Sequence, residues 1–152
     1  MLVLVAFLQL TMPIDSTALN QAADFAGLPH DVIYAVAWME SRSGSRGNAY
    51  RGPGREVCDS IGQCHKACRE IGRMQVNPCI HWPAPYCARD SLKVYWSNVK
   101  CGAAILHWRY ATTGSWPAAI RTYNGGGKKA DDYLERALAY IGWLALRKVD
   151  VM

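Results

Sequence analysis

The stretch AVAWMES at residues 35–41 decides the fold of this chain, because it places one acidic side chain, Glu40, at the end of an apolar helical run. The apolar residues in and before it recur at helical spacing, which predicts a helix with one face toward the core: Val32, Ile33, Val36 and Met39. Pro29 suits the first turn of this helix. A run of Gly, Ser and Arg at residues 42–47 follows, so Glu40 is expected in the last helical turn.

Helical spacing continues along the rest of the chain, and no convincing strand alternation is found. Ser16 is a suitable N-cap and Gly27 a suitable stop for the first of the further helices. These helices are expected at residues 16–27, 90–114, 115–124 and 130–147. Residues 48–68 are rich in glycine and turn formers and predict a long loop, of the kind that carries function or needs cross-links. The sequence therefore predicts a mainly α domain.

The length of 152 residues suits one domain with a buried core. Hydrophobic residues make up 51% and charged residues 19%, which indicates a compact globule rather than a disordered chain. The net charge of +5 fits either an ordinary soluble surface or attraction to an anionic polymer. Because no basic run of five residues occurs, nucleic acid is not expected as a partner.

The N-terminal segment, residues 1–12, is apolar but shorter than the roughly 20 residues that span a bilayer. No Lys or Arg occurs before Arg42, and no small-residue cleavage site precedes Pro13, so a complete secretory signal is not found. Three interpretations remain: a signal shortened by the choice of start codon, a short uncleaved anchor, or a first helix on the core. We divide the chain into this segment and a domain at residues 13–152.

Six cysteines lie in the middle third of the chain, at positions 58, 64, 68, 79, 87 and 101. An even number crowded around loops predicts disulfides and an oxidising compartment, although six cysteines allow 15 pairings. We expect three disulfides that tie residues 48–78 to the start of the long helix. The alternatives are free buried thiols, or a zinc site made by Cys64, His65, Cys68 and His81. No CxxC or HxxxH pair is present, so neither a metal nor a cofactor is expected.

Two later segments contain glycine beside polar or aromatic residues: GRMQ at residues 72–75 and TYNGGG at residues 122–127. Glycine lets the backbone approach another molecule closely, and the Gln75 amide offers both a donor and an acceptor. The alternatives are an ordinary amphipathic turn for the first segment and a helix C-cap for the second, since Asn-Gly-Gly suits a cap.

In order and residue type, these three motifs resemble the catalytic domain of the lytic transglycosylases. The resemblance covers about residues 16–148. That family shares its fold with goose-type lysozyme and cleaves the glycan strands of peptidoglycan. The resemblance implies a single, mainly α, lysozyme-like domain, here with long loops stapled by disulfides. Glu40-Ser41 is similar to the start of the family's catalytic motif, and residues 72–75 to its Gly-Leu-Met-Gln segment, with Arg73 in place of the usual leucine.

The resemblance also implies roles for single residues. Glu40 would be the catalytic acid, and the substrate-binding residues would be Ser41, Met74, Gln75, Tyr123, Asn124 and Tyr133. Tyr133 matches the aromatic residue that opens the family's last helix, and its hydroxyl is expected to hydrogen-bond Glu40. The alternative for Tyr133 is a core tyrosine at helical spacing.

A general acid must be protonated near neutral pH, and Glu40 has two features that favour this. Its neighbours Val36 to Met39 are apolar, and burial against them would raise the pKa of its carboxyl. The partial negative charge at the helix C-terminus would act in the same direction. The alternative is a solvated glutamate at a helix end.

The number of carboxylates distinguishes two reactions. Retaining and inverting hydrolases use two carboxylates, whereas lytic transglycosylases are thought to use one, with the substrate's N-acetyl group as nucleophile and a 1,6-anhydro ring as product. Glu70 and Asp59 are candidate second carboxylates. The favoured reaction is transglycosylation, and the alternatives are a hydrolytic goose-type muramidase and a glycan-binding assembly module without catalysis.

The small single domain is similar to transglycosylases that open the cell wall for secretion, pilus or conjugation machines, and a phage virion enzyme is the close competitor. The expected partners are peptidoglycan glycan strands and such an assembly or a phage tail. The expected form is a monomer in the bacterial periplasm or cell envelope, or in a virion that acts on the periplasmic wall.

Overall fold

The computed structural model describes residues 16–41, 56–58, 64–66, 70–80 and 82–149. Five α-helices dominate this part of the chain: α2 (Ser16–Ala26), α3 (His30–Ser41), α4 (Tyr95–Thr113), α5 (Trp116–Tyr123) and α6 (Gly127–Val149). Two 3-10 turns precede α4, namely η1 (Pro85–Cys87) and η2 (Ser91–Lys93). The expected mainly α architecture is confirmed. The segment at residues 1–12 lies outside the described residues.

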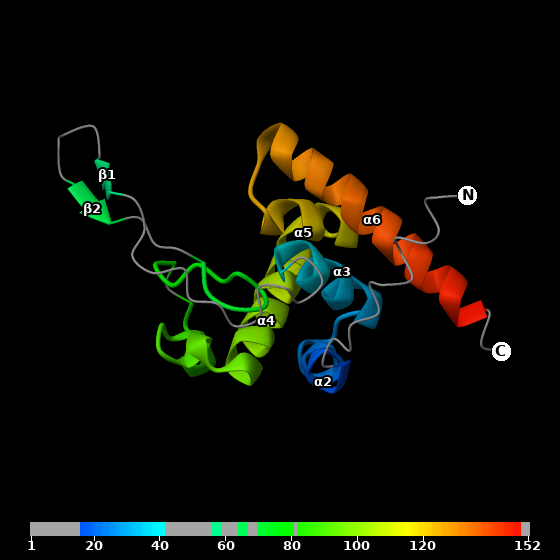
Figure 1. Cartoon of the computed structure of the whole chain (residues 1–152), viewed down its shortest axis with the longest axis horizontal. Helices are drawn as coiled ribbons and strands as arrows, with labels where there is room; N and C mark the ends of the chain where they lie inside the picture. The colour runs from blue at the N-terminus through cyan, green and yellow to red at the C-terminus, as the bar shows by residue number, and fades with distance from the viewer. Residues whose placement is uncertain (1–15, 42–55, 59–63, 67–69, 81, 150–152) are drawn as a thin grey trace.

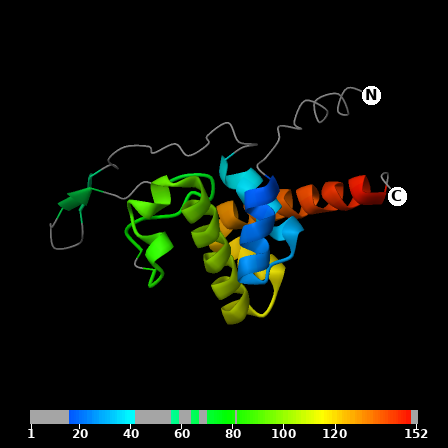
Figure 2. The same ribbon diagram turned by 90° about the horizontal axis from the view of Figure 1, so that it is seen from below.

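The helices pack around one core (Figure 1). Helix α4 contacts α2 and α5, while α6 contacts α3 and α5. The C-terminal half of α6 extends past the other helices (Figures 1 and 2). Large side chains that are fully buried join these helices to the segment before η1: Leu19, Ile33, Val36, Ile71, Met74, Leu92, Val99, Leu106 and Ile120. The core therefore runs directly beneath the segment that contains residues 72–75.

The helix ends follow the predicted capping chemistry in part. Ser115 accepts a hydrogen bond from the backbone N–H of Ala118 at 3.3 Å, as a helix N-cap does. Gly114 closes α4 in the left-handed conformation at φ 76°. The long helix begins at Tyr95 rather than Asp90, because Val94 has extended backbone and separates α4 from the 3-10 turn η2.

One short hairpin accompanies the helices, although the sequence shows no convincing strand alternation. Within the predicted loop, β1 (Glu56–Cys58) and β2 (Cys64–Lys66) pair as an antiparallel hairpin, with Val57 opposite His65. The hairpin lies away from the helical body (Figures 1 and 2). Strands of three residues are too short to show the alternation that predicts a strand from sequence.

Disulfides are present, as expected. Cys87 in η1 is bonded to Cys101 in α4, with the two Cα atoms 5.2 Å apart. Cys79 is also disulfide-bonded, so none of these three cysteines is a free thiol. The alternative zinc site falls on Cys64, His65, Cys68 and His81, whose side chains lie outside the described residues. The partner of Cys101 is not in residues 48–78, which differs from the expected connectivity. Cys68 and the side chains of Cys58 and Cys64 lie outside the described part of the chain.

Within the described residues, no helix combines the length and apolar character needed to cross a membrane. The same residues contain no group of three or more His, Cys, Asp or Glu side chains arranged to hold a metal ion.

Candidate active site

Glu40 lies in the last turn of α3, where the sequence places it, and its side chain is partly buried. The hydroxyl of Tyr133 donates a hydrogen bond of 2.9 Å to Glu40 Oε1, although the two residues are 93 positions apart. Tyr133 belongs to α6 and is only 4% exposed, so it is both a core residue and the partner of Glu40. The expected contact between these two side chains is present.

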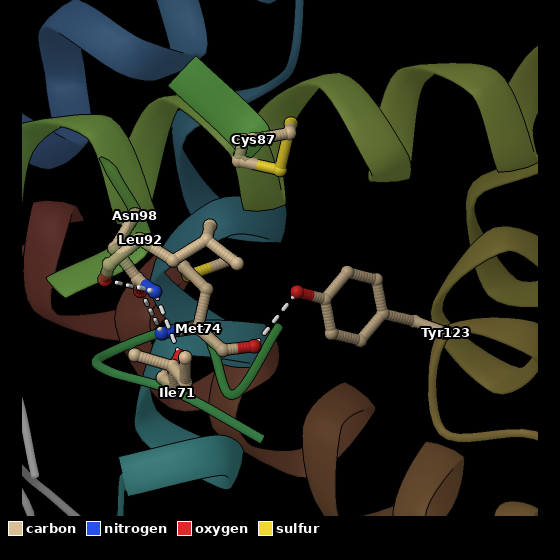
Figure 3. Close-up of a disulfide and its surroundings, with 7 residues drawn as sticks. Ile71, Met74, Cys87, Leu92, Asn98 and Tyr123 are labelled. Carbon is tan, nitrogen blue, oxygen red and sulfur yellow. Dashed lines mark hydrogen bonds between the residues drawn. A yellow bond between two sulfur atoms is a disulfide. The ribbon is translucent and has the colours of Figure 1, made fainter. Parts of the chain in front are cut away.

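A second tyrosine, Tyr123 at the end of α5, belongs to the same site. Its hydroxyl donates a 2.8 Å hydrogen bond to the backbone carbonyl of Met74 (Figure 3). The pKa values of Tyr123 and Tyr133 are both raised well above the ordinary value, first by burial and next by the negative charge of Glu40. Both hydroxyls therefore remain protonated at neutral pH and keep their role as donors.

The segment with Gly72 and Gln75 forms a tight turn closed by pairing between Ile71 and Val76. Gly72 has φ +76°, and a Cβ atom there would lie 2.4 Å from Nδ2 of Asn98. Gln75 is the one non-glycine residue of the described chain with positive φ, at 46°. Its Nε2 donates a 2.7 Å hydrogen bond to the Gly72 carbonyl, which fixes the side-chain amide against its own turn. Only a glycine at position 72 fits this geometry without strain.

Asn98 in α4 holds this turn in place, and sequence reasoning missed it. Its side chain is fully buried, accepts from the Met74 N–H at 2.8 Å, and donates to the carbonyls of Ile71 and Leu92 at 2.7 and 3.2 Å (Figure 3). One turn further along α4, Gly102 leaves room for the Met74 side chain, because a Cβ at position 102 would lie 2.6 Å from it. A polar asparagine within the apolar face of a predicted helix was the available signal.

Ser41 and Met74 were expected to bind substrate, and the structure places both side chains at 0% exposure, behind the surface. The Ser41 hydroxyl donates a 2.6 Å hydrogen bond to the Ala37 carbonyl and accepts one from Arg73. Met74 acts through its backbone, which Asn98 and Tyr123 bind from either side. Both residues therefore fix the elements that present Glu40 and Gln75.

Arg73 is 2% exposed, although an arginine is costly to bury. Its guanidinium donates to Ser41 Oγ, but Nε and Nη2 have no hydrogen-bond partner. Burial lowers the pKa of Arg73, and the neighbouring Tyr95 and Tyr140 oppose this shift. The position thus holds a buried cation with incomplete hydrogen bonding where the resembling motif has leucine.

We expect Arg73→Leu to raise the free energy of unfolding by about 1–3 kcal/mol, because replacing a buried charged group by an apolar one is often stabilising. Ser41 keeps its bond to Ala37 in this variant. Denaturant unfolding of the two proteins measures the difference, with Arg121→Leu as the control because Arg121 is paired with Asp131 at the surface. A clear loss of stability in Arg73→Leu would show that the guanidinium is needed to close the end of α3.

A groove of about 240 Å³ lies beside these elements. Among its lining residues are Glu70, Gln75, Asn77, Tyr123 and Asn124, so the two glycine-marked motifs meet on one surface. Glu70, one of the two candidate second carboxylates, is exposed and lies in this groove. The other candidate, Asp59, lies outside the described residues. The site thus combines a partly buried carboxyl, held by Tyr133, with a groove whose residue Tyr123 lies within electrostatic reach of that carboxyl.

The fold is lysozyme-like and similar to that of a solved lytic transglycosylase. The chain matches the structure of an inactive mutant of lytic transglycosylase Slt from Pseudomonas aeruginosa with a TM-score of 0.58 and 18% sequence identity. The match covers 86% of this chain and 24% of the other, so the chain spans about a quarter of that protein's length. A search of curated proteins gave no significant match.

Residues 17–144 match the family described as Transglycosylase SLT domain, and the chain belongs to this family. The match includes α3, the turn at residues 72–75, and most of α6.

Proposed function

We propose that this chain is a peptidoglycan lytic transglycosylase that cleaves the β-1,4 bond between N-acetylmuramic acid and N-acetylglucosamine. The observation that carries the proposal is the hydrogen bond from Tyr133 to Glu40 in a chain of the SLT family. The charge of Glu40 acts on Tyr123, which lines the groove together with Gln75 and Asn124. The domain at residues 13–152 would be the catalytic unit. No cofactor takes part.

In the proposed reaction, Glu40 gives its proton to the glycosidic oxygen as the bond from that oxygen to C1 of the muramic residue breaks. The carbonyl oxygen of the substrate's own N-acetyl group forms a bond to C1. The C6 hydroxyl then attacks C1 and gives its proton to Glu40, while the bond from the N-acetyl oxygen to C1 breaks. This closes the 1,6-anhydro ring, restores the N-acetyl group and consumes no water. The bond from Tyr133 keeps the Glu40 carboxyl oriented through both steps.

The turn at residues 72–75 would place the sugar on the groove. Gln75 lines the groove, and the hydroxyl of Tyr123 holds the turn by its hydrogen bond to the Met74 carbonyl. Asn124 lines the same groove from the end of α5. These groups position the substrate, and holding the C6 hydroxyl next to C1 favours ring closure over attack by water.

Hydrolysis by a goose-type muramidase is the second candidate, and the observation that favours it is Glu70 in the groove. In that reaction Glu70 would activate a water molecule. A non-catalytic glycan-binding module is the third candidate, which Glu40 and its hydrogen bond to Tyr133 argue against.

The products of digested sacculi separate the first two candidates. We expect muropeptides that end in 1,6-anhydromuramic acid, one water lighter than hydrolysed products and resistant to borohydride reduction. Digestion in heavy-oxygen water gives an independent reading, because ring closure incorporates no solvent oxygen. Reducible products that carry the label would contradict the transglycosylase, and Glu70→Gln would then be expected to abolish activity.

We further propose that the protein works in the bacterial periplasm or cell envelope, because peptidoglycan lies there, or in a phage virion that acts on the same wall. A disulfide between Cys87 and Cys101 is in keeping with an oxidising compartment. Secretion, pilus, conjugation or phage-tail assemblies are the proposed partners, with the enzyme itself a monomer.

A further inference from the structure

Arg109 of α4 lies in the groove beside Tyr123 and is not accounted for by the proposed chemistry. Its guanidinium is held over the ring of Trp108, with the guanidinium carbon 4.8 Å from the ring centre. Trp108 in turn forms a T-shaped pair with Trp82, with 5.7 Å between the ring centres. Stacking of this kind restricts the arginine side chain, so the cation is presented to the groove in a defined position.

The charge of Arg109 is not neutralised by another described residue. The described ion pairs of Lys93 and Arg121 use Asp90 and Asp131, whereas Arg109 forms none. Its Nε atom is buried without a hydrogen-bond partner. Burial and the charge of Glu40 raise the pKa of Tyr123, and the positive charge of Arg109 opposes them, which places the guanidinium within electrostatic reach of the site.

We propose that Arg109 binds a carboxylate on the peptide stem of the substrate. The inference rests on the proposed function. In a strand that carries its peptides, the lactyl carboxyl of each substituted muramic residue is held in an amide bond to the stem and the sugar rings are neutral, so the free carboxylates lie on the peptides. An arginine fork pairs well with a carboxylate through two parallel hydrogen bonds. Glu70 lies in the same groove, and its negative charge would repel a substrate carboxylate bound next to it. The favourable place for a carboxylate in this groove is therefore beside Arg109.

The test measures binding of the Glu40→Gln protein, which should not cleave, to native sacculi and to sacculi whose carboxyl groups have been converted to methylamides. Amidation should weaken binding about tenfold or more, the effect of losing a charged hydrogen-bonded pair. Adding Arg109→Gln should weaken binding to native sacculi by a similar factor and remove the difference between the two substrates. Arg109→Lys should keep part of the difference, and thermal melts confirm that each variant is folded.

Lys100→Gln is the matched control, since it removes the same charge from the same helix. The Lys100 ammonium lies over Phe25 and Tyr86, 4.1 and 4.7 Å from their ring centres. This variant should keep the full preference for native sacculi. The inference is overturned if Arg109→Gln retains that preference, or if Lys100→Gln loses as much of it. A different result would refute the proposed function itself: the unsubstituted protein would release no muropeptides from native sacculi.

Discussion

Glu40→Gln should lower the rate of muropeptide release from sacculi by about 10²–10⁴-fold, because an amide cannot deliver the proton that the leaving oxygen needs. The fold should survive this change. The glutamine Oε1 can still accept the hydrogen bond that Tyr133 donates to Glu40 at 2.9 Å. Release is measured on purified protein by chromatography of the soluble muropeptides, and circular dichroism during heating shows whether the variant unfolds at the parental temperature.

Glu135→Gln is the matched control for this experiment. Glu135 is exposed on α6, two residues after Tyr133, so the substitution makes the same change of charge away from the site. Activity of this variant should equal that of the parent. A folded Glu40→Gln protein that still releases muropeptides at the parental rate would refute the catalytic assignment. A binding module would give a different pattern. Neither the parent nor Glu40→Gln would release muropeptides, and both would bind sacculi equally well.

Much of the helical framework was predictable because its signals are local. Apolar residues at helical spacing predicted α3, and Ser115 and Gly114 marked the junction of α4 and α5. The start of α4 was placed five residues early, since Asp90 has the chemistry of a helix cap but begins only a 3-10 turn. The hairpin of β1 and β2 was missed because it depends on pairing between two short segments, which leaves little pattern in either one.

The contact between Glu40 and Tyr133 was expected through the resemblance to a family, and neither side chain's neighbours in sequence would have revealed it. The contacts that hold the turn at residues 72–75 against α4 were not expected. Asn98 acts on a turn 24 residues before it, and the tight approach at Gly102 depends on how Met74 packs. Arg73 was identified only as a departure from the usual leucine of the motif, and its burial against Ser41 was not expected. These contacts depend on how the turn docks against α4 and α3, which a single sequence does not encode locally.

Asn98→Ala should lower the free energy of unfolding by about 3 kcal/mol or more. Three buried hydrogen bonds are lost, and the Met74 N–H and the Ile71 carbonyl are left without these partners inside the core. A cavity adds to this cost. Activity should fall as well, even well below the melting temperature, because the turn that carries Gln75 loses its attachment to α4. Denaturant unfolding and muropeptide release measure the two effects.

Two further substitutions show whether the hydrogen bonds themselves are responsible. Asn20→Ala is the control for removing an asparagine from a helix, since Asn20 lies in α2 and its Oδ1 has no hydrogen-bond partner; it should change stability little. Asn98→Asp keeps an acceptor for the Met74 N–H but turns a second oxygen toward the Ile71 and Leu92 carbonyls. We expect Asn98→Asp to be at least as unstable as Asn98→Ala at neutral pH, because a buried carboxylate facing carbonyl oxygens is repelled and poorly solvated. A stable, active Asn98→Asp protein would mean that the two donated bonds are dispensable and that shape alone holds the turn.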